Sequence, residues 1–392
     1  MRRLLIPLLC ACLSLLAATC AALPTAPLVA PPAPPIPTPT AQLLPPPTPV
    51  ILTRPAEATT APATAAPSPS PPAIRPAQPT PSPTPHLLAG VTLDALRARD
   101  YPGGPVEILA TLETTEAYTR YHIAYPSDGL RITGIMQVPP GAGPFPVIIL
   151  NHGYAERDAY WPGSGTWQAA EFLNRRGYLT VAPDYRSWGA SDWGPSLFHT
   201  GLLADVLNLI GALATVPQAD PTRIGMWGHS MGGGITTKAL TVEPRIRAAV
   251  LYASNSADDA DLIARWGPGC LPGETQYTTK CNPAEVLLPD LPPEIVAAYL
   301  IAAADPAMLQ QIAPIHHLGS VTAPVQIHIG AADGAEHNAT PPEWSAKLHD
   351  ALLAAGKSSE LFVYEGQGHL FVGGAWTEMM TRAADFFDAH VK

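Results

Sequence analysis

The sequence predicts an α/β fold, in which a mostly parallel central sheet carries helices on both faces. Three observations indicate this class. Short apolar runs alternate with segments of helical periodicity over most of residues 120–390. The runs are continuously apolar, which is typical of strands buried on both faces. One run leads directly into Gly228-His229-Ser230-Met231-Gly232, a Gly-x-Ser-x-Gly turn of the kind that joins a strand to a helix.

The individual elements follow from these patterns. Residues 121–125 and 130–138 are expected to form an antiparallel pair, because Pro126-Ser127-Asp128-Gly129 between them favours a turn. A helix over 167–176 ends at Gly177, a common stop signal. The other expected strands lie at 146–150, 178–182, 223–227, 246–252, 325–329 and 360–364, and the other expected helices at 202–215, 231–239, 342–355 and 376–390.

The alternation is interrupted at about residues 254–320. This stretch is rich in proline and aspartate and contains two predicted helices, so we expect a small cap inserted over the edge of the sheet that carries the site. Cys270 and Cys281 lie eleven positions apart within it, which predicts a local disulfide. A metal site is the alternative for these two cysteines, but no CxxC pair accompanies them.

The first 22 residues have the pattern of an export signal. Arg2 and Arg3 precede an uncharged apolar run over residues 4–22. Ala17-Ala18-Thr19-Cys20 is similar to a lipobox, which makes Cys20 a candidate for lipidation, although Thr19 departs from the usual small residue before the cysteine. Plain secretion and an uncleaved membrane anchor are the alternatives. Lipidation, secretion and an uncleaved anchor would each place the catalytic part outside the cytoplasm. The only contact with a membrane that we expect is through an anchor at the N-terminus.

Residues 23–90 are predicted to form a disordered linker. Of the 48 prolines in the chain, 23 lie between Pro24 and Pro85, among Ala, Thr and Ser, so this stretch cannot bury a core. A proline-rich ligand for a partner domain is the other reading. Residues 91–392 remain as one domain, ample for a buried core. The formal net charge of the chain, −10, argues against nucleic acid as a partner, since phosphate backbones require a basic face.

Three side chains of complementary chemistry follow three predicted strands. Ser230 stands at the turn, Asp333 follows the strand at 325–329, and His369 follows the strand at 360–364. Because the carboxyl ends of parallel strands meet at one edge of a sheet, we expect a nucleophile, an orienting acid and a general base to converge. Glu336, three residues beyond Asp333, is the reserve acid.

An acyl transfer also needs two donors for the oxyanion. The backbone N–H groups of Met231 and Tyr154 are the expected pair, because one follows the nucleophile and the other lies in the loop after the strand at 146–150. His152 and His229 flank the site and are expected to have structural roles, by packing or by hydrogen bonding to the backbone.

These motifs resemble the α/β-hydrolase superfamily, and most closely the catalytic domain of the prolyl-oligopeptidase-like, dienelactone-hydrolase-like serine hydrolases. The matching segments are His152-Gly153, 175–178, 183–186, the turn at Ser230, Asp333 and Gly368-His369. The resemblance covers about residues 120–390 and implies an α/β-hydrolase fold. It also implies that Asp184 and Arg186 support the loop beside the site. Tyr154 departs from the pattern, since many relatives have a second glycine there.

The predicted function is that of an exported serine hydrolase that acts on small esters or short peptides through an acyl-enzyme on Ser230. Peptidases of this family commonly carry a β-propeller, whereas about 30 residues, 91–120, precede the hydrolase pattern here. Access of substrates to the site is therefore expected to depend on the cap and on four tryptophans, Trp161, Trp167, Trp188 and Trp193. The alternative is that these tryptophans are simply buried in the core.

A catalytically inactive binding protein on the same fold is the main alternative, and its signature would be a missing member of the triad. A metalloenzyme is less favoured, because His316-His317 is the only adjacent histidine pair and no His-Glu-x-x-His motif accompanies it. The sequence predicts neither a metal nor a cofactor.

Overall fold

The computed structural model describes residues 86–392. The predicted export signal, Cys20 and residues 23–85 of the predicted linker lie outside the described residues. Residues 86–90, also assigned to the linker, belong to the 3-10 helix η1 (His86–Val91). Leu88 in this helix is buried in an apolar cluster with Tyr299 and Ile312. The packed part of the chain therefore includes residues before position 91, the predicted start of the domain.

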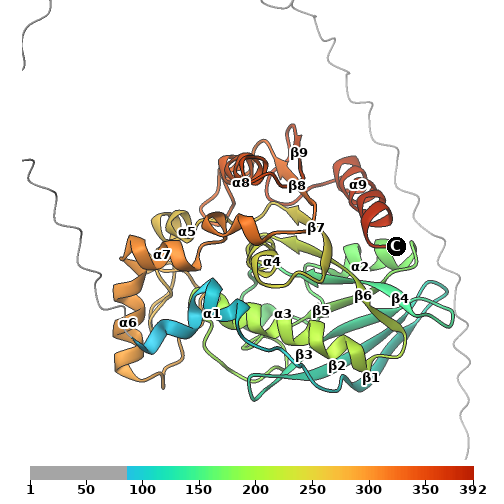
Figure 1. Cartoon of the computed structure of the whole chain (residues 1–392), viewed down its shortest axis with the longest axis horizontal. Coiled ribbons are helices and arrows are strands. Elements are labelled where there is room, and N and C mark those ends of the chain that lie inside the picture. Colours follow the sequence, from blue (N-terminus) through green and yellow to red (C-terminus); the bar gives the residue numbers. More distant parts are fainter. Residues whose placement is uncertain (1–85) are drawn as a thin grey trace, which may run out of the picture. The chain divides into compact units, whose positions relative to one another are not determined.

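A nine-stranded mixed sheet forms the centre of the described part (Figure 1). Its strand order is β1-β2-β3-β5-β4-β6-β7-β8-β9. The first three strands and the β3–β5 pair are antiparallel, and from β5 to β9 all neighbours are parallel. The strands are β1 Glu107–Thr114, β2 Thr119–Ser127, β3 Leu130–Val138, β4 Phe145–Asn151, β5 Leu179–Pro183, β6 Ala219–His229, β7 Ile246–Tyr252, β8 Val325–Gly330 and β9 Ser359–Tyr364.

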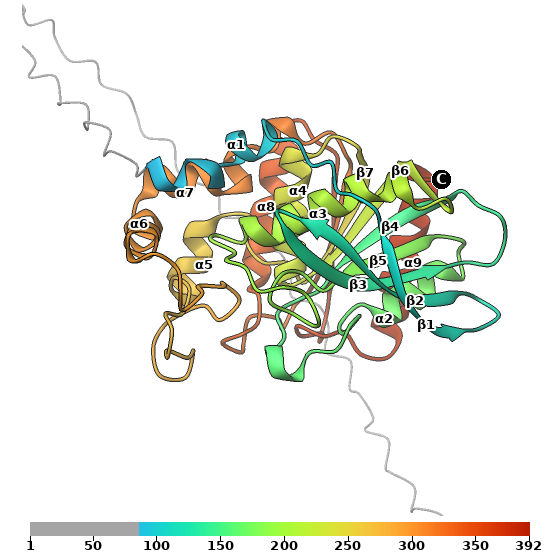
Figure 2. The same cartoon turned by 90° about the horizontal axis from the view of Figure 1, so that it is seen from below.

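Helices cover both faces of this sheet, as the continuous apolar strands predict (Figure 2). One large apolar cluster lies between the sheet and α3, α4 and α8, and a second lies between the sheet and α2 and α9. The helices are α1 Leu93–Arg97, α2 Trp167–Asn174, α3 Thr200–Ala212, α4 Met231–Val242, α5 Asp259–Trp266, α6 Pro293–Ala303, α7 Pro306–Ile312, α8 Pro342–Ala354 and α9 Gly374–His390. The prediction of an α/β-hydrolase fold is confirmed.

The edge strand β1 was not predicted from the sequence. Seven of its eight residues are exposed, including Ile108 and Leu112, and it pairs only with β2. Its side chains therefore have neither the alternation nor the continuous apolar run by which strands are recognised. Strand β6 also begins at Ala219, before Pro221, whereas the sequence predicted a start at residue 223. The predicted helix at 167–176 ends earlier, at Asn174.

The interruption between β7 and β8 contains α5, α6 and α7, one helix more than predicted. In both views these helices lie together beyond the sheet, coloured yellow to orange (Figures 1 and 2). A disulfide joins Cys270 and Cys281 within this cap. Among residues 86–392 no single helix is long and apolar enough to cross a membrane, although α6 and α7, bent by 95°, together reach that length and composition.

A buried ion pair fastens the cap to α4. The Lys238 ammonium lies 2.8 Å from a carboxylate oxygen of Asp259 in α5 and donates to the Ile312 carbonyl oxygen at 2.7 Å. Burial raises the pKa of Asp259, while Lys238 favours its charged form. Lys238 thus attaches two helices of the cap, α5 and α7, to α4, the helix that follows Ser230. Removing either charged partner would leave the other charge buried and unpaired.

Candidate active site

Ser230 stands at a strained turn between β6 and α4. Its φ and ψ are 54° and −120°, a left-handed conformation rare for a residue with a side chain. The turn is possible only because its neighbours lack Cβ atoms. A Cβ on Gly232 would overlap the carbonyl oxygen of Asn151 in β4, and one on Gly228 would overlap the carbonyl oxygen of Gly232. Both motif glycines are therefore required by close approach of the backbone.

The loop after β4 closely approaches the serine. A Cβ added to Gly153 would lie 3.1 Å from the Cβ of Ser230, so the backbone here leaves little room for a side chain. The next residue, Tyr154, lines the same cavity as Ser230 and Met231. Met231 is the first residue of α4, and its N–H belongs to the positive end of that helix. The two residues predicted to supply oxyanion donors thus border one cavity beside the serine hydroxyl.

His369 links the serine to a buried carboxylate. Its Nε2 lies 3.0 Å from the Ser230 Oγ, and its Nδ1 lies 3.0 Å from one oxygen of Asp333 and 3.2 Å from the other. The Asp333 side chain is 0% exposed, whereas the His369 side chain is 23% exposed. With the ring proton on Nδ1, the imidazole can accept the hydroxyl proton while the carboxylate holds the ring in that tautomer.

The carboxylate of Asp333 is held by donors from its own loop. One oxygen accepts from the N–H groups of Gly334 at 2.8 Å and Thr340 at 3.0 Å, and the other lies 2.9 Å from the Thr340 hydroxyl. The sequence did not single out Thr340, since no spacing motif marks a threonine seven residues after an aspartate. The reserve acid, Glu336, is exposed, and its backbone carbonyl accepts from Arg265.

His229 and His152 are buried and neutral, as expected of structural histidines. Burial lowers the pKa of His229 to about 3 and the pKa of His152 to about 4. The Nε2 of His229 lies 3.3 Å from the carbonyl oxygen of His369, and the two rings are 4.9 Å apart. The Nδ1 of His152 lies 2.7 Å from the carbonyl oxygen of Gly153. Both rings therefore hold the backbone of the loops that meet at Ser230.

Asp184, directly after β5, fixes the loop that borders the site. Its two carboxylate oxygens accept from Thr133 at 2.6 Å and Tyr160 at 2.7 Å, and burial raises its pKa. The Nε2 of His152 lies 3.2 Å from its carbonyl oxygen. Asp184 thus connects the end of β5 to β3 and to the loop that follows β4. This agrees with the supporting role that the resemblance implied.

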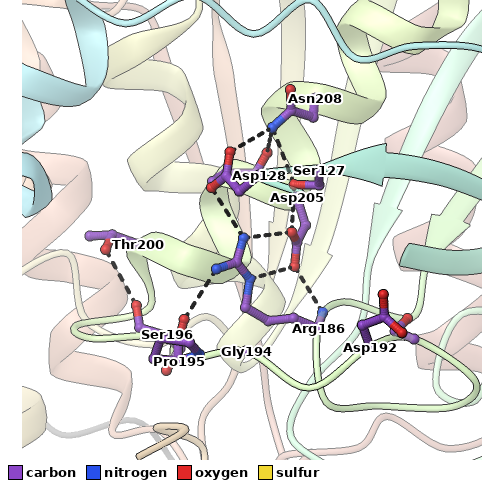
Figure 3. Close-up of polar contacts among 12 residues, drawn as sticks. Ser127, Asp128, Arg186, Asp192, Gly194, Pro195, Ser196, Thr200, Asp205 and Asn208 are labelled. Carbon is purple, nitrogen blue, oxygen red and sulfur yellow. Dashed lines mark hydrogen bonds and ion pairs between the residues drawn. The ribbon is translucent and has the colours of Figure 1, made fainter. Parts of the chain in front are cut away.

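Arg186 anchors the same loop to α3 and to the β2–β3 turn (Figure 3). Its guanidinium donates to both oxygens of the buried Asp205, at 2.8 and 3.1 Å, and to Asp128 at 3.3 Å. Ser127 also donates to Asp205, at 2.7 Å. A bidentate pair with further donors satisfies the buried charges and attaches this irregular segment to α3 and to the β2–β3 turn.

Two further pockets share lining residues with the cavity at Ser230, Tyr154 being common to all three. One is lined by Trp193, Tyr277 and Arg157, among others. The other passes His229 and is lined by Trp167, Leu370 and Val372. Of the four tryptophans singled out from the sequence, Trp188 is buried and donates to the Ala155 carbonyl oxygen at 2.9 Å, while the other three are exposed.

The described residues contain no group of three or more His, Cys, Asp or Glu side chains arranged to hold a metal ion.

Comparison with known proteins identifies the family. The alpha/beta hydrolase family model matches residues 147–383. An uncharacterized 31.7 kDa protein of Escherichia coli is 30% identical over 126 residues, which cover 32% of this chain and 42% of that protein. A lysophosphatidylserine lipase of Xenopus tropicalis is 33% identical over 93 residues, 24% of this chain and 22% of that protein. The chain thus matches less than half the length of either relative.

Solved structures share the fold at low sequence identity. Acetyl xylan esterase 1 from Thermoanaerobacterium sp. JW/SL YS485 aligns with a TM-score of 0.52 and 18% identity, over 75% of this chain and 90% of that one. A puromycin-hydrolyzing peptidase of Mycobacterium tuberculosis aligns with a TM-score of 0.53 and 20% identity, over 72% of this chain and 41% of that one. These likenesses show the fold. The family match over residues 147–383, more than half of the chain, shows that the chain belongs to the alpha/beta hydrolase family.

Proposed function

We propose that this protein is an exported serine hydrolase that cleaves acyl bonds, esters before peptides, through an acyl-enzyme on Ser230. The observation that carries the proposal is the continuous chain of hydrogen-bond contacts from the Ser230 hydroxyl through His369 to the buried carboxylate of Asp333. An inactive descendant of such an enzyme would be free to lose one of these three groups, and this chain retains all of them.

Each step follows from the contacts. The Ser230 oxygen bonds to the substrate carbonyl carbon while its proton passes to Nε2 of His369. The negative charge on the carbonyl oxygen is stabilised by the N–H groups of Met231 and Tyr154. As the bond to the leaving group breaks, Nε2 returns the proton to the leaving oxygen or nitrogen. Water, deprotonated by the same nitrogen, then hydrolyses the acyl-serine and restores the hydroxyl.

The names of similar proteins fit acyl transfer to water. A lysophosphatidylserine lipase and two acetyl xylan esterases are named for ester substrates, and an acylaminoacyl peptidase is named for an amide substrate. We favour esters because an alkoxide is an easier leaving group than an amine. Export is supported by the signal-like N-terminus and by the disulfide, since disulfides persist in oxidising compartments.

Active-site labelling tests this function. A fluorophosphonate probe should label the folded wild-type protein on Ser230, and Ser230→Ala should remove both the label and the hydrolysis of p-nitrophenyl acetate. Ser191→Ala is a matched control, because Ser191 is a buried serine bonded to Thr133 rather than to a histidine. A folded wild-type protein that takes no label and hydrolyses no ester would support the inactive binding protein instead.

A further inference from the structure

The cavity at Ser230 is lined by uncharged side chains, and more of its lining surface is apolar than polar. Besides Ser230 itself, the polar lining residues are Asn255, Gln276, Asn282 and Asn338, and the others are Tyr154, Trp266, Met231, Pro283 and Ala284. Among the described residues that line it there is no Asp, Glu, Lys or Arg. Burial also raises the pKa of Tyr154, which keeps its phenol neutral.

Part of this carboxamide set is free to bind a ligand. The side chains of Asn255 and Asn338 make no hydrogen bond with other residues of the 86–392 segment. Asn255 is nevertheless buried, and its backbone N–H donates to the carbonyl oxygen of Ser230 at 2.9 Å. Its carboxamide is not among the buried side-chain groups of the described residues that lack a partner, because it lines the cavity and stays open to water. A ligand can replace that water and bind this side chain next to the reacting carbonyl.

Three charged side chains contact or adjoin the lining residues without lining the cavity themselves. Arg265 donates to the carbonyl oxygens of Gly334 and Glu336, at 3.1 and 2.7 Å. Arg157 stacks over Trp188 at 4.3 Å and donates to the Pro283 carbonyl oxygen at 3.2 Å, and Glu156 accepts from the Gln276 amide at 3.3 Å. The side chains that line the cavity thus include no counter-ion for a charged substrate group.

From this lining we infer that the cavity selects substrates whose group beside the scissile carbonyl is uncharged and forms hydrogen bonds. An ammonium or carboxylate placed there would lose hydration without gaining an ion pair, whereas a hydroxyl or amide exchanges water for carboxamide partners. The inference rests on the proposed function. Hydroxyls of a sugar or glycerol and the amide of an internal peptide share this chemistry.

Matched esters test the inference. The substrates are the p-nitrophenyl esters of N-acetyl-β-alanine, 3-hydroxypropionic acid, β-alanine and succinic acid, which present an amide, a hydroxyl, an ammonium and a carboxylate at the same distance from the carbonyl. Each kcat/KM is divided by the rate of hydroxide-catalysed hydrolysis of the same ester. We expect the amide and hydroxyl esters to exceed both charged esters by about tenfold or more, which corresponds to about 1.4 kcal/mol. The better of the two neutral esters shows whether the cavity prefers an amide or a hydroxyl on the acyl side of the scissile bond.

Variants that introduce a carboxylate at the cavity should gain a preference for the ammonium ester. Asn338→Asp and Asn255→Asp each place a carboxylate at the cavity and should raise the preference for the β-alanine ester over its N-acetyl analogue by about tenfold. Asn338 is exposed, so its variant is expected to fold even where substitution of the buried Asn255 disturbs the turn. Gln218→Glu makes the same change in charge before the start of β6, at the opposite end of that strand from Ser230, and should leave the preference unchanged.

The outcomes separate this inference from the proposed function. Hydrolysis of all four esters at similar normalised rates, or a preference for a charged ester, would refute the selection while leaving a serine hydrolase. An unaltered preference in a folded Asn338→Asp variant and in a folded Asn255→Asp variant would refute it as well. If Ser230 takes no probe and no ester is hydrolysed, the proposed function fails first.

Discussion

The hydroxyl of Thr340 lies 2.9 Å from Asp333 Oδ2 and 3.0 Å from the carbonyl oxygen of Ala253, so one proton has two acceptors. The ionised carboxylate is the stronger acceptor. Thr340 is fully buried, and its hydroxyl is also 3.4 Å from Nδ1 of His369. It thus joins the acid of the site to the end of β7.

Thr340→Val should lower kcat/KM by about tenfold, the effect of losing one hydrogen bond to a charged group. Thr340→Ser retains the hydroxyl and should restore the activity, which steady-state kinetics with p-nitrophenyl acetate measures. Near-normal activity of Thr340→Val, or no recovery in a folded Thr340→Ser variant, would show that Thr340 only packs.

Asp333→Asn should reduce kcat by about 10³–10⁴-fold, because an amide can hold His369 in the wrong tautomer. Steady-state kinetics with p-nitrophenyl acetate measures this loss, and circular dichroism checks the fold. Glu336→Gln is the matched control at an exposed acid of the same loop and should retain near-normal rates. Near-normal activity of Asp333→Asn together with inactivity of Glu336→Gln would transfer the role of the acid to Glu336.

Removal of the cap disulfide should affect substrate binding more than chemistry. Gln276 lies within the loop closed by Cys270 and Cys281, and Asn282 follows it directly. In the Cys270→Ser, Cys281→Ser double variant this wall of the cavity loosens, so KM should rise several-fold with a smaller change in kcat. The closed loop is short, so the loss of stability should be about 2–3 kcal/mol. A larger fall in kcat than rise in KM would contradict this account.

His328→Gln should make the protein less sensitive to acid. Burial lowers the pKa of His328 to about 3, so between about pH 6.5 and pH 3 the unfolded chain binds a proton that the folded chain does not. Stability therefore falls with decreasing pH in that window, by up to about 1.4 kcal/mol per pH unit from this residue. The His328→Gln variant should lose the contribution of this residue to the pH dependence of the free energy of unfolding.

Urea denaturation at several pH values between 4 and 7 measures the slope. Phe362→Leu is the control, because it removes a ring that stacks on His328 but no titratable group. It should displace the stability curve without changing its slope. Equal slopes for the wild type and His328→Gln would contradict the prediction.

Most of the parallel sheet and the three groups at Ser230 could be predicted from the sequence, for a common reason. Buried strands such as β4 and β7 are continuous apolar runs. Ser230 directly follows β6, Asp333 lies three residues after β8, and His369 lies five residues after β9, so local pattern indicates their place at one edge of the sheet. The glycine motif could also be recognised, because its residues lie within five consecutive positions even though Gly232 is required by the approach of Asn151 in β4.

What could not be predicted depends on contacts between distant segments. Strand β1 is exposed and is defined only by its pairing with β2. Thr340 reaches Asp333 through the fold of an irregular loop. The carboxamide lining is assembled from the segment after β7, the cap and the loop after β8, and no single stretch of sequence contains it.

The most direct test of the account is to identify the acyl-enzyme itself. Wild-type protein is mixed with p-nitrophenyl acetate, quenched in acid within the first turnover, digested and examined by mass spectrometry. We predict that the peptide containing Ser230 gains the mass of one acetyl group on that serine, and that Ser230→Ala gains none. Rapid hydrolysis with no acetyl group on Ser230, or with the same rate in Ser230→Ala, would contradict it.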